Sequence, residues 1–507
     1  MTFIVNTEQM INAELNSEKE GISRIQLMKN AAKGCFKYLK NHFSNLRGEK
    51  FVILCGKGNN GGDGVELASV LTENGGKVTV ILTDEMPGSE TAKECRNSHS
   101  VRLNTIKYSE NKAAAEDILS AATIIIDCVF GTGFHGELSA GIKELFDFIA
   151  KCKGYKISVD IPSGINGNTG IVTPHSFKAD ATLVLAAMKT GLLNSPAFDH
   201  CGEVKITDIG ISDDCYTEYD GALTDGEILG LMPSRPKSAN KGTFGRLLNV
   251  AGGGCYLGAA LLSSKGALKI GTGLVTLASV KRVIAAAAPA LPECIYEELP
   301  KDKEGFISDK ALPILGELAE KATAVTIGCG MGNRSDTKNI VGFLLKKGKC
   351  PVILDADGIN SIADNINVLK DNNRPIILTP HPGELGRLLH KSVGEIQADR
   401  LNIAKGFAKE YGVVLLLKGN GTVIAAPDGR VMVNTTGNNA LAKAGCGDVL
   451  TGIVGGLAAQ GVDPFAAAVL GAYLHGLSAD ILIQKQASFS VMASDVAEGL
   501  GRISMGG

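Results

Sequence analysis

Short apolar segments rich in Val, Ile and Leu alternate along the whole chain with longer segments of helical periodicity. In the first half, helical stretches such as 64–74, 111–121 and 139–151 separate apolar segments at 51–55, 78–82, 123–127, 156–160, 182–186 and 204–207. In the second half the apolar segments are 246–251, 274–278, 323–327, 351–355, 375–379 and 413–417, and a small-residue-rich helical region follows from about 447 to 484. Strands that alternate with helices form parallel sheets covered on both faces, so the pattern predicts an α/β fold.

The alternation is interrupted once, between Gly210 and Lys241. This segment is polar, contains two prolines and lacks a long apolar run, and a new strand-then-glycine pattern begins at Gly242. We therefore expect two α/β domains, residues 1–215 and 216–507, each large enough to fold alone.

Composition excludes several classes of function. Lys and Arg number 51 against 53 Asp and Glu, so no charge excess favours nucleic acid or an anionic membrane surface. The 12 cysteines include no Cys-x-x-Cys pair, which predicts reduced thiols rather than a zinc site or a disulfide framework. The first basic residue is Lys19, and we expect neither a signal peptide nor an apolar run approaching the about 20 residues of a membrane span. The expected location is the cytoplasm.

A glycine-rich turn, GKGNNGGDG at 56–64, follows the apolar segment 51–55. Such a turn directs several backbone N–H groups at an anion, and the N-terminus of the following helix assists. It is not a Walker A loop, because no Gly-Lys-Ser/Thr closes it, and we do not expect the Gly-x-Gly-x-x-Gly fingerprint of a dinucleotide-binding turn here. The alternative is a tight strand-to-helix turn without a ligand. The two Asn and the Asp among the glycines favour a binding turn.

Two further expected strands end in oxygen-bearing side chains. Asp127 precedes a second glycine turn, FGTGFHGE, and Asp160 and Ser163 follow the next strand. Ligands of open parallel sheets bind at the carboxyl ends of the strands, so we expect one shared site rather than isolated helix caps. The oxygens of Asn60, Asp127 and Ser163 suit a hard monovalent or divalent cation, whereas Asp160 is placed to act as a general base.

These motifs resemble the NAD(P)H-hydrate epimerase domain over about residues 5–210, through LMKNAA, GNNGGDG, FGTG, VDIPSGINGNTG and DIGI. The resemblance implies a potassium ion at Asn60, Asp127 and Ser163, and proton transfer at Asp160. It implies contact with the hydrated nucleotide at Asn59, Asn60, Gly61, Gly62, Asp63, Gly131, Thr132, Gly133, Phe134, His135, Gly136, Glu137 and Asp160. Two positions depart from the family pattern: Lys29 stands where Glu is usual, and Met188-Lys189-Thr190 replaces a Pro-Lys-Pro.

Near the C-terminus, Gly445-Cys446-Gly447-Asp448 opens a helix. N–H groups at a helix N-terminus stabilise a transferring phosphoryl group, and an adjacent carboxylate can accept the proton of an attacking hydroxyl. The alternative, an ordinary N-cap at Asp448, is disfavoured by similar turns after the other strands. These turns are AGGG at 251–254, GCGMG at 328–332, LDADG at 354–358, TPHPGE at 379–384 and KGNGT at 418–422.

With NKGTFG, GAA and AGCGDVLTG, these turns stand in the order found in ADP-dependent NAD(P)H-hydrate dehydratases, members of the ribokinase-like superfamily, over about residues 225–505. The resemblance implies Mg²⁺ and ADP, with Asp448 as the base. It implies substrate contacts at Ala260, Gly332, His381 and Asp448. It implies ADP contacts at Lys418, Gly419, Asn420, Gly421, Thr422, Gly445, Cys446 and Gly447. Cys446 replaces the Thr or Ser common in the family, which removes a hydroxyl but keeps the backbone N–H.

Together the resemblances imply an N-terminal Rossmann-like three-layer sandwich and a C-terminal ribokinase-like three-layer α/β/α domain. They imply an enzyme that interconverts the R and S hydrates NADHX and NADPHX and dehydrates the S form with ADP, yielding NAD(P)H, AMP and phosphate. The expected partners are these small molecules and further copies of the chain, with neither nucleic acid nor membrane.

Two alternatives stay open. The first is a sugar or vitamin-precursor kinase of the same superfamily, which an ATP-versus-ADP assay would distinguish. The second is a non-catalytic nucleotide-binding protein, and the intact Asp160 and Asp448 argue against it.

Overall fold

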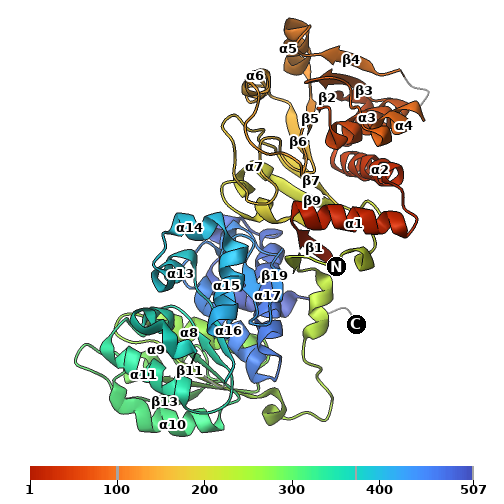
Figure 1. Cartoon of the computed structure of the whole chain (residues 1–507). Helices are drawn as coiled ribbons and strands as arrows, with labels where there is room; N and C mark the ends of the chain where they lie inside the picture. Colours follow the sequence, from red (N-terminus) through yellow and green to blue (C-terminus); the bar gives the residue numbers. More distant parts are fainter. Residues whose placement is uncertain (99–101, 371–373, 505–507) are drawn as a thin grey trace. The chain divides into compact units, whose positions relative to one another are not determined.

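The chain forms two compact units, Met1–Ala222 and Leu223–Gly507, in a computed structural model that describes residues 1–98, 102–370 and 374–504 (Figure 1). The sequence analysis placed the division between residues 215 and 216. The units divide inside the short strand β10 (Gly221–Leu223), after the polar stretch that holds Asp213 and Asp214.

The described part of the first unit contains a seven-stranded sheet of order β4-β3-β2-β5-β6-β7-β9, in which neighbouring strands run parallel. Its strands are β2 (Lys50–Cys55), β3 (Lys77–Leu82), β4 (Asn104–Lys107), β5 (Ile124–Cys128), β6 (Tyr155–Val159), β7 (Ala181–Leu185) and β9 (Glu203–Thr207). All the predicted strands of this half are confirmed. The edge strand β4 was not predicted, because its sequence NTIK is half exposed and carries no apolar run.

Helices cover both faces of this sheet. On one face α2 (Arg24–His42) and α3 (Asn59–Glu73) pack against alternate side chains of β2, such as Ile53. On the other face α5 (Lys112–Ala121) and α6 (Ala140–Ile149) pack against the intervening side chains, such as Leu54. The two-residue period of a strand divides its side chains between two cores in this way. The remaining elements include α1 (Thr7–Lys19), α4 (Glu90–Asn97), α7 (Phe198–Cys201) and the parallel pair β1 (Thr2–Val5) and β8 (Met188–Lys189).

The second unit has strand order β13-β12-β11-β14-β15-β16-β17-β18-β19 over its described residues. The strands are parallel as far as β17, and β18 and β19 extend the sheet antiparallel. They are β11 (Arg246–Val250), β12 (Leu274–Ser279), β13 (Ile295–Glu298), β14 (Ala324–Ile327), β15 (Val352–Leu354), β16 (Ile376–Leu378), β17 (Val414–Leu417), β18 (Val423–Ala425) and β19 (Val431–Val433). The α/β class predicted for this half is confirmed, and β13, β18 and β19 are additions to it.

Two helices of this unit approach each other through glycines. A Cβ atom on Gly452 of α16 (Cys446–Ala459) would lie 1.9 Å from the carbonyl oxygen of Ser263 in α8 (Leu257–Lys269), and one on Gly266 would lie 2.4 Å from the carbonyl oxygen of Val449. Only glycine permits such backbone contact. The other helices are α9 (Lys281–Ala287), α10 (Leu312–Lys321), α11 (Ser335–Lys346), α12 (Asp357–Asn360), α13 (Pro382–Leu389), α14 (Val393–Ala398), α15 (Arg400–Tyr411), α17 (Pro464–Ile483) and α18 (Ala493–Gly499).

Helix α17 corrects one expectation. It is long and apolar enough to cross a membrane by length and composition, with a mean hydropathy of 1.5, so the view that no apolar run approaches this length was wrong. However, 72% of that window is buried inside the protein, where α17 contacts α16 and the strands β16, β17 and β18. Its apolar composition is that of a core helix enclosed by its neighbours on most sides.

Candidate active sites

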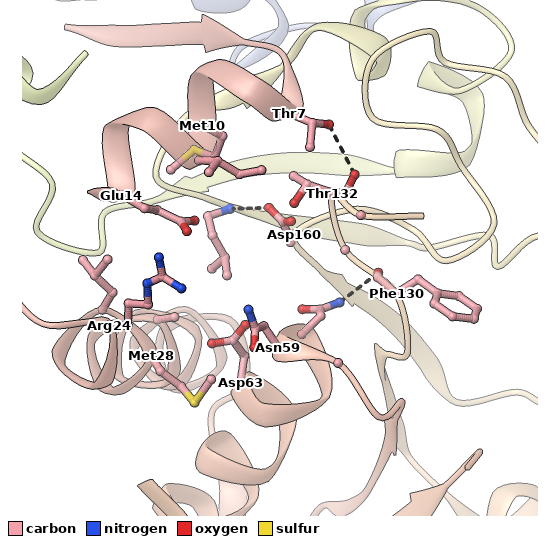
Figure 2. Close-up of a pocket in the computed structure, with 18 of the residues that line it drawn as sticks. Thr7, Met10, Glu14, Arg24, Met28, Asn59, Asp63, Phe130, Thr132 and Asp160 are labelled. Carbon is pink, nitrogen blue, oxygen red and sulfur yellow. Dashed lines mark hydrogen bonds between the residues drawn. The ribbon is translucent and has the colours of Figure 1, made fainter. Parts of the chain in front are cut away.

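The first unit contains a cavity of about 490 Å³ at the carboxyl ends of β2, β5 and β6. Helices α1 and α2 contribute to its wall, and Thr7 of α1 donates a hydrogen bond to the carbonyl oxygen of Thr132 at 3.3 Å (Figure 2). The cavity brings together the predicted substrate-contact residues Asn59, Asn60, Asp63, Gly131, Thr132, Gly133, Phe134 and Asp160.

The remaining predicted contacts of this unit lie outside the cavity lining. Gly61 packs behind it, because a Cβ atom there would lie 1.8 Å from the carbonyl oxygen of Gly56, and Gly62 is buried in the same way against Met28. His135 and Gly136 follow in the chain but do not line the cavity, and Glu137 is largely exposed and pairs with Lys143 at 3.3 Å. Glycines 56, 58 and 61 do have the Gly-x-Gly-x-x-Gly spacing of a dinucleotide-binding turn, so the expectation that this fingerprint is absent was wrong.

Asp160 forms a buried ion pair at the edge of the cavity. Its Oδ1 lies 2.6 Å from Nζ of Lys189, which also donates to the carbonyl oxygen of Leu185 at 2.6 Å. Asp160 has φ 71°, a strained left-handed conformation for a residue other than glycine, and such strain is concentrated at functional sites. The sequence analysis noted Lys189 only as part of an unusual tripeptide, although it follows a predicted strand at the same edge of the sheet.

Two further carboxyl groups face the cavity. Burial, followed by the negative charges of Asp160 and Glu14, raises the pKa of Asp63 well above its usual value. Burial also raises the pKa of Glu14, against the opposing charge of Lys189. Raised pKa values favour the protonated form of both groups, which can donate a proton in the cavity. Glu14 belongs to α1, which the sequence analysis did not assign to the site.

The three predicted cation ligands lie together beneath the cavity. Ser163 donates to Asp127 through its hydroxyl at 2.7 Å and its backbone N–H at 2.8 Å. The Nδ2 of Asn60 donates to the carbonyl oxygens of Phe130 and Val159, and its buried Oδ1 has no hydrogen-bond partner among the described residues. Burial raises the pKa of Asp127 to about 6. A buried unpaired oxygen beside a buried carboxyl group is an arrangement that a cation satisfies.

In the second unit, Asp448 lies in the first turn of α16. Gly445, in the left-handed conformation with φ 90°, occupies the N-cap position, so the ordinary N-cap role considered for Asp448 does not apply. Burial, followed by the charge of Asp355, raises the pKa of Asp448 to about 6, against the hydrogen bond from Cys329 and the charge of Lys418. Ligand atoms of Cys329, Asp355 and Asp448 all lie within 4.8 Å of one another.

A buried network places Lys418 beside the N-terminus of α16. Its Nζ donates to Asp355 Oδ1 at 2.7 Å, and Asp355 also accepts the hydroxyls of Thr451 at 2.7 Å and Thr379 at 2.9 Å. Burial alone would raise the pKa of Asp355, but the Lys418 charge and these hydrogen bonds lower it. A Cβ atom on Gly447 would lie 3.4 Å from Nζ, so the ammonium group and the helix N-terminus form one anion-binding position.

The KGNGT turn rests on a buried arginine that the sequence analysis did not identify. Arg400 of α15 donates through Nη2 to the carbonyl oxygens of Leu417, Lys418 and Gly421 at 3.1–3.4 Å. Thr422 closes the turn by donating to the carbonyl oxygen of Gly419 at 2.9 Å, and Asn420 is exposed at its tip.

The predicted ligand contacts of this unit differ in how far they are exposed and in what they bind. His381 is half exposed and caps α13, accepting the N–H groups of Gly383 and Glu384 at Nδ1 at 3.0 and 3.3 Å. Gly332 donates its N–H to Asp357 at 2.7 Å, and Cys446 is buried. Ala260 is fully buried beneath the turn at 251–254, so the structure does not bring its side chain to a surface.

Two α/β units, each with glycine turns beside carboxyl groups of perturbed pKa, define an enzyme with two nucleotide-binding catalytic domains. The sequence profile of NAD(P)H-hydrate dehydratases matches residues 247–502, and that of the YjeF-related protein N-terminus matches residues 24–191. The bifunctional NAD(P)H-hydrate repair enzyme of Moorella thermoacetica is 37% identical over 493 residues, 96% of this chain and 93% of the relative. The chain belongs to the family of bifunctional NAD(P)H-hydrate repair enzymes, as its motifs predicted.

Two further relatives agree with this assignment. The bifunctional NAD(P)H-hydrate repair enzyme of Escherichia coli is 33% identical over 487 residues, 95% of this chain and 90% of the relative. A crystal structure of the ADP/ATP-dependent NAD(P)H-hydrate dehydratase of Bacillus subtilis, co-crystallised with ATP and Mg²⁺, is 34% identical with a TM-score of 0.50. It covers 56% of this chain, which itself covers 97% of that structure. The predicted ribokinase-like fold of the second unit is thereby confirmed.

Proposed function

We propose that this chain repairs hydrated NADH and NADPH with one active site in each unit. The first unit interconverts the R and S hydrates at Asp160, and the second dehydrates the S hydrate at Asp448 with ADP. The observation that carries this proposal is the presence of a separate, buried catalytic carboxyl group in each of two family-matched units.

Dehydration needs an activated leaving group, because hydroxide leaves a saturated ring carbon poorly. Transfer of the ADP β-phosphoryl group to the ring hydroxyl produces AMP and a phosphate ester, and loss of phosphate restores NAD(P)H. Asp448 is placed to accept the hydroxyl proton. Lys418 and the N–H groups of Gly445–Gly447 are placed to hold the transferring phosphoryl group. The residues assigned to ADP by resemblance surround this position or form the adjacent KGNGT turn.

Magnesium fits this site through one of its carboxylates. Asp355 offers the hard oxygen donors that Mg²⁺ prefers, whereas the thiol of Cys329 does not suit it and Asp448 is the proposed base. When bound with the nucleotide, Mg²⁺ neutralises phosphate charge. The Bacillus subtilis dehydratase crystallised with ATP and Mg²⁺ supports this part of the proposal.

Potassium fits the first unit. The unpaired Oδ1 of Asn60, the carboxyl group of Asp127 and the hydroxyl of Ser163 provide a buried set of oxygen donors. A monovalent ion there would compensate the buried Asp127 charge and hold the two glycine turns together. We expect KCl to raise the melting temperature of the first unit more than equimolar NaCl, and Asp127→Asn to remove the difference.

We further propose a homo-oligomer in the cytoplasm, and the 12 free cysteines are in line with a reducing compartment. Light scattering on the purified chain and fractionation of the producing cells test these two points.

The central experiment incubates the purified chain with mixed R and S hydrates and ADP, and follows the formation of reduced nicotinamide. Complete conversion is expected. Asp160→Asn should stop near the initial S fraction, and Asp448→Asn should form no product while the R and S forms still exchange. Absence of ADP-driven product from the wild-type chain refutes the proposal, and phosphorylation of a sugar or vitamin precursor by ATP would favour the kinase alternative.

A further inference from the structure

We propose that Lys189 is a positioning residue of the first active site, whose ammonium group fixes Asp160 as the oriented carboxylate that accepts the substrate's hydroxyl proton. The inference rests on the epimerase role proposed for the first unit.

The geometry divides the two oxygens of Asp160 between two tasks. Oδ1 is bound by Nζ of Lys189 at 2.6 Å. Oδ2 points toward the second glycine turn, where a Cβ atom on Gly131 would lie 3.1 Å from it. Gly131 lines the cavity, so Oδ2 is the oxygen left to meet a ligand. The ion pair therefore orients Asp160 without occupying its cavity-facing oxygen.

Lys189 is itself held firmly. Its residue lies on β8, paired with Val5 of β1, and its ammonium group also donates to the carbonyl oxygen of Leu185 at 2.6 Å. Its side chain is only 2% exposed. Ordering a lysine side chain costs conformational entropy, so a lysine fixed by two contacts inside a cavity wall is a preorganised group rather than a solubilising one.

The charges around this pair show why a cation is needed. Glu14 of α1 and Asp63 of α3 line the same cavity as Asp160, and Arg24 of α2 lies partly exposed and pairs with Glu18 at 3.2 Å. Within the described lining, Lys189 is thus the buried cation among three carboxyl groups. Removing it would leave the Asp160 carboxylate buried and unpaired, which is strongly unfavourable.

The chemistry requires an oriented carboxylate. Hydration of an enamine places the hydroxyl on the ring carbon next to nitrogen. Inversion at that carbon follows if the hydroxyl proton passes to Asp160, the oxygen forms a carbonyl, and the carbon–nitrogen electron pair moves to nitrogen. Nitrogen then takes the proton from Asp160, and ring closure on the opposite face reverses these steps. All atoms and electrons balance without a second substrate, and Lys189 exchanges no proton.

The test uses Lys189→Ala in the full chain, without ADP so that only R–S exchange occurs. We expect kcat for exchange to fall about 100-fold or more, the size of a general-base contribution, while KM changes less than about threefold. Ethylammonium chloride should occupy the vacated cation position and raise the exchange rate of Lys189→Ala at least about tenfold. Dehydration of the S hydrate after addition of ADP should keep its wild-type rate.

Lys156→Ala is the matched control. This lysine is also partly buried and donates to backbone carbonyl oxygens, of Cys152 at 2.8 Å and Gly154 at 3.3 Å, but it lies at the opposite end of β6. Its exchange rate should equal that of the wild type. If Lys189→Ala does not fold, Lys189→Met keeps the side-chain volume and tests the same role.

A double variant separates positioning from direct catalysis. Because Lys189 acts through Asp160, adding Lys189→Met to Asp160→Asn should lower the exchange rate little further. Ethylammonium should raise the rate of neither the Asp160→Asn variant nor the double variant. A raised KM with unchanged kcat in both Lys189 variants, or independent losses in the double variant, would overturn the inference. A wild-type chain that exchanges no hydrate would instead refute the proposed function of the first unit.

Discussion

Asp448 gives the second active site a pH signature that can be measured directly. Its pKa is raised to about 6 because burial and the charge of Asp355 disfavour its ionised form. A base of this pKa is about 90% ionised at pH 7 and about 10% at pH 5, so dehydration should fall about tenfold over that interval, and less where the charge of bound Mg²⁺ favours the carboxylate. A carboxyl group with the ordinary pKa of 3.8 would lose only about 6% of the rate.

The assay follows reduced nicotinamide from the S hydrate between pH 5 and pH 8. Because ADP also changes its ionisation in this range, the comparison that identifies Asp448 is with Cys329→Ala. The Cys329 thiol donates a hydrogen bond that lowers the pKa of Asp448, so its removal should move the midpoint upward. The same midpoint in both proteins would refute the reasoning.

The same shift predicts an effect on stability. The folded-state pKa of Asp448 exceeds the unfolded value of 3.8, so the stabilising contribution is complete below pH 3.8 and is lost as the pH rises through 6. At pH 7 the ionised group therefore opposes folding. Asp448→Asn should inactivate dehydration yet increase the free energy of unfolding of the second unit by about 2 kcal/mol, allowing for partial exposure, as measured by urea denaturation.

Two other substitutions test the glycine turn and the buried network. Gly61→Ala should lower the melting temperature of the first unit and abolish hydrate exchange, since its Cβ atom would lie 1.8 Å from the carbonyl oxygen of Gly56. A Cβ atom at Gly58 would have no neighbour within 4 Å, so Gly58→Ala should keep a near-wild-type melting temperature. Equal melting temperatures of the two variants would contradict this account. Asp355→Asn should raise KM for ADP at least about tenfold, because Lys418 loses its anchor, and an unchanged KM would argue against that role.

The fold was predictable from the sequence because buried parallel strands are continuous apolar runs. Several elements escaped prediction: β4 and β13 carry no continuous apolar run, and β18 and β19 are short strands outside the alternation of strands with helices. The membrane criterion failed for α17 for the opposite reason, since a helix enclosed on most sides is apolar all round.

The site residues that were predictable from the sequence are those that lie within one glycine turn or at the end of one strand. The glycine turns and the aspartates Asp160 and Asp448 can be recognised from the local sequence in this way. Their partners do not, because Lys189, Glu14 and Asp355 reach them only through the packing of distant segments. His381 shows a converse difficulty: its position after a strand suggested a ligand contact, yet its ring caps a helix.

The glycine contact between α8 and α16 has a consequence for reading mutational scans of this family. Any side chain at Gly452 or Gly266 forces the two helices apart, and α16 carries Asp448 at its first turn. In an activity-selected library these two positions should be as intolerant as Asp448, although neither takes part in the chemistry. Raising the concentration of substrate or ADP should not restore activity to variants at either position. Measuring both activity and protein abundance for each variant would distinguish positions needed for the fold from positions needed for the chemistry.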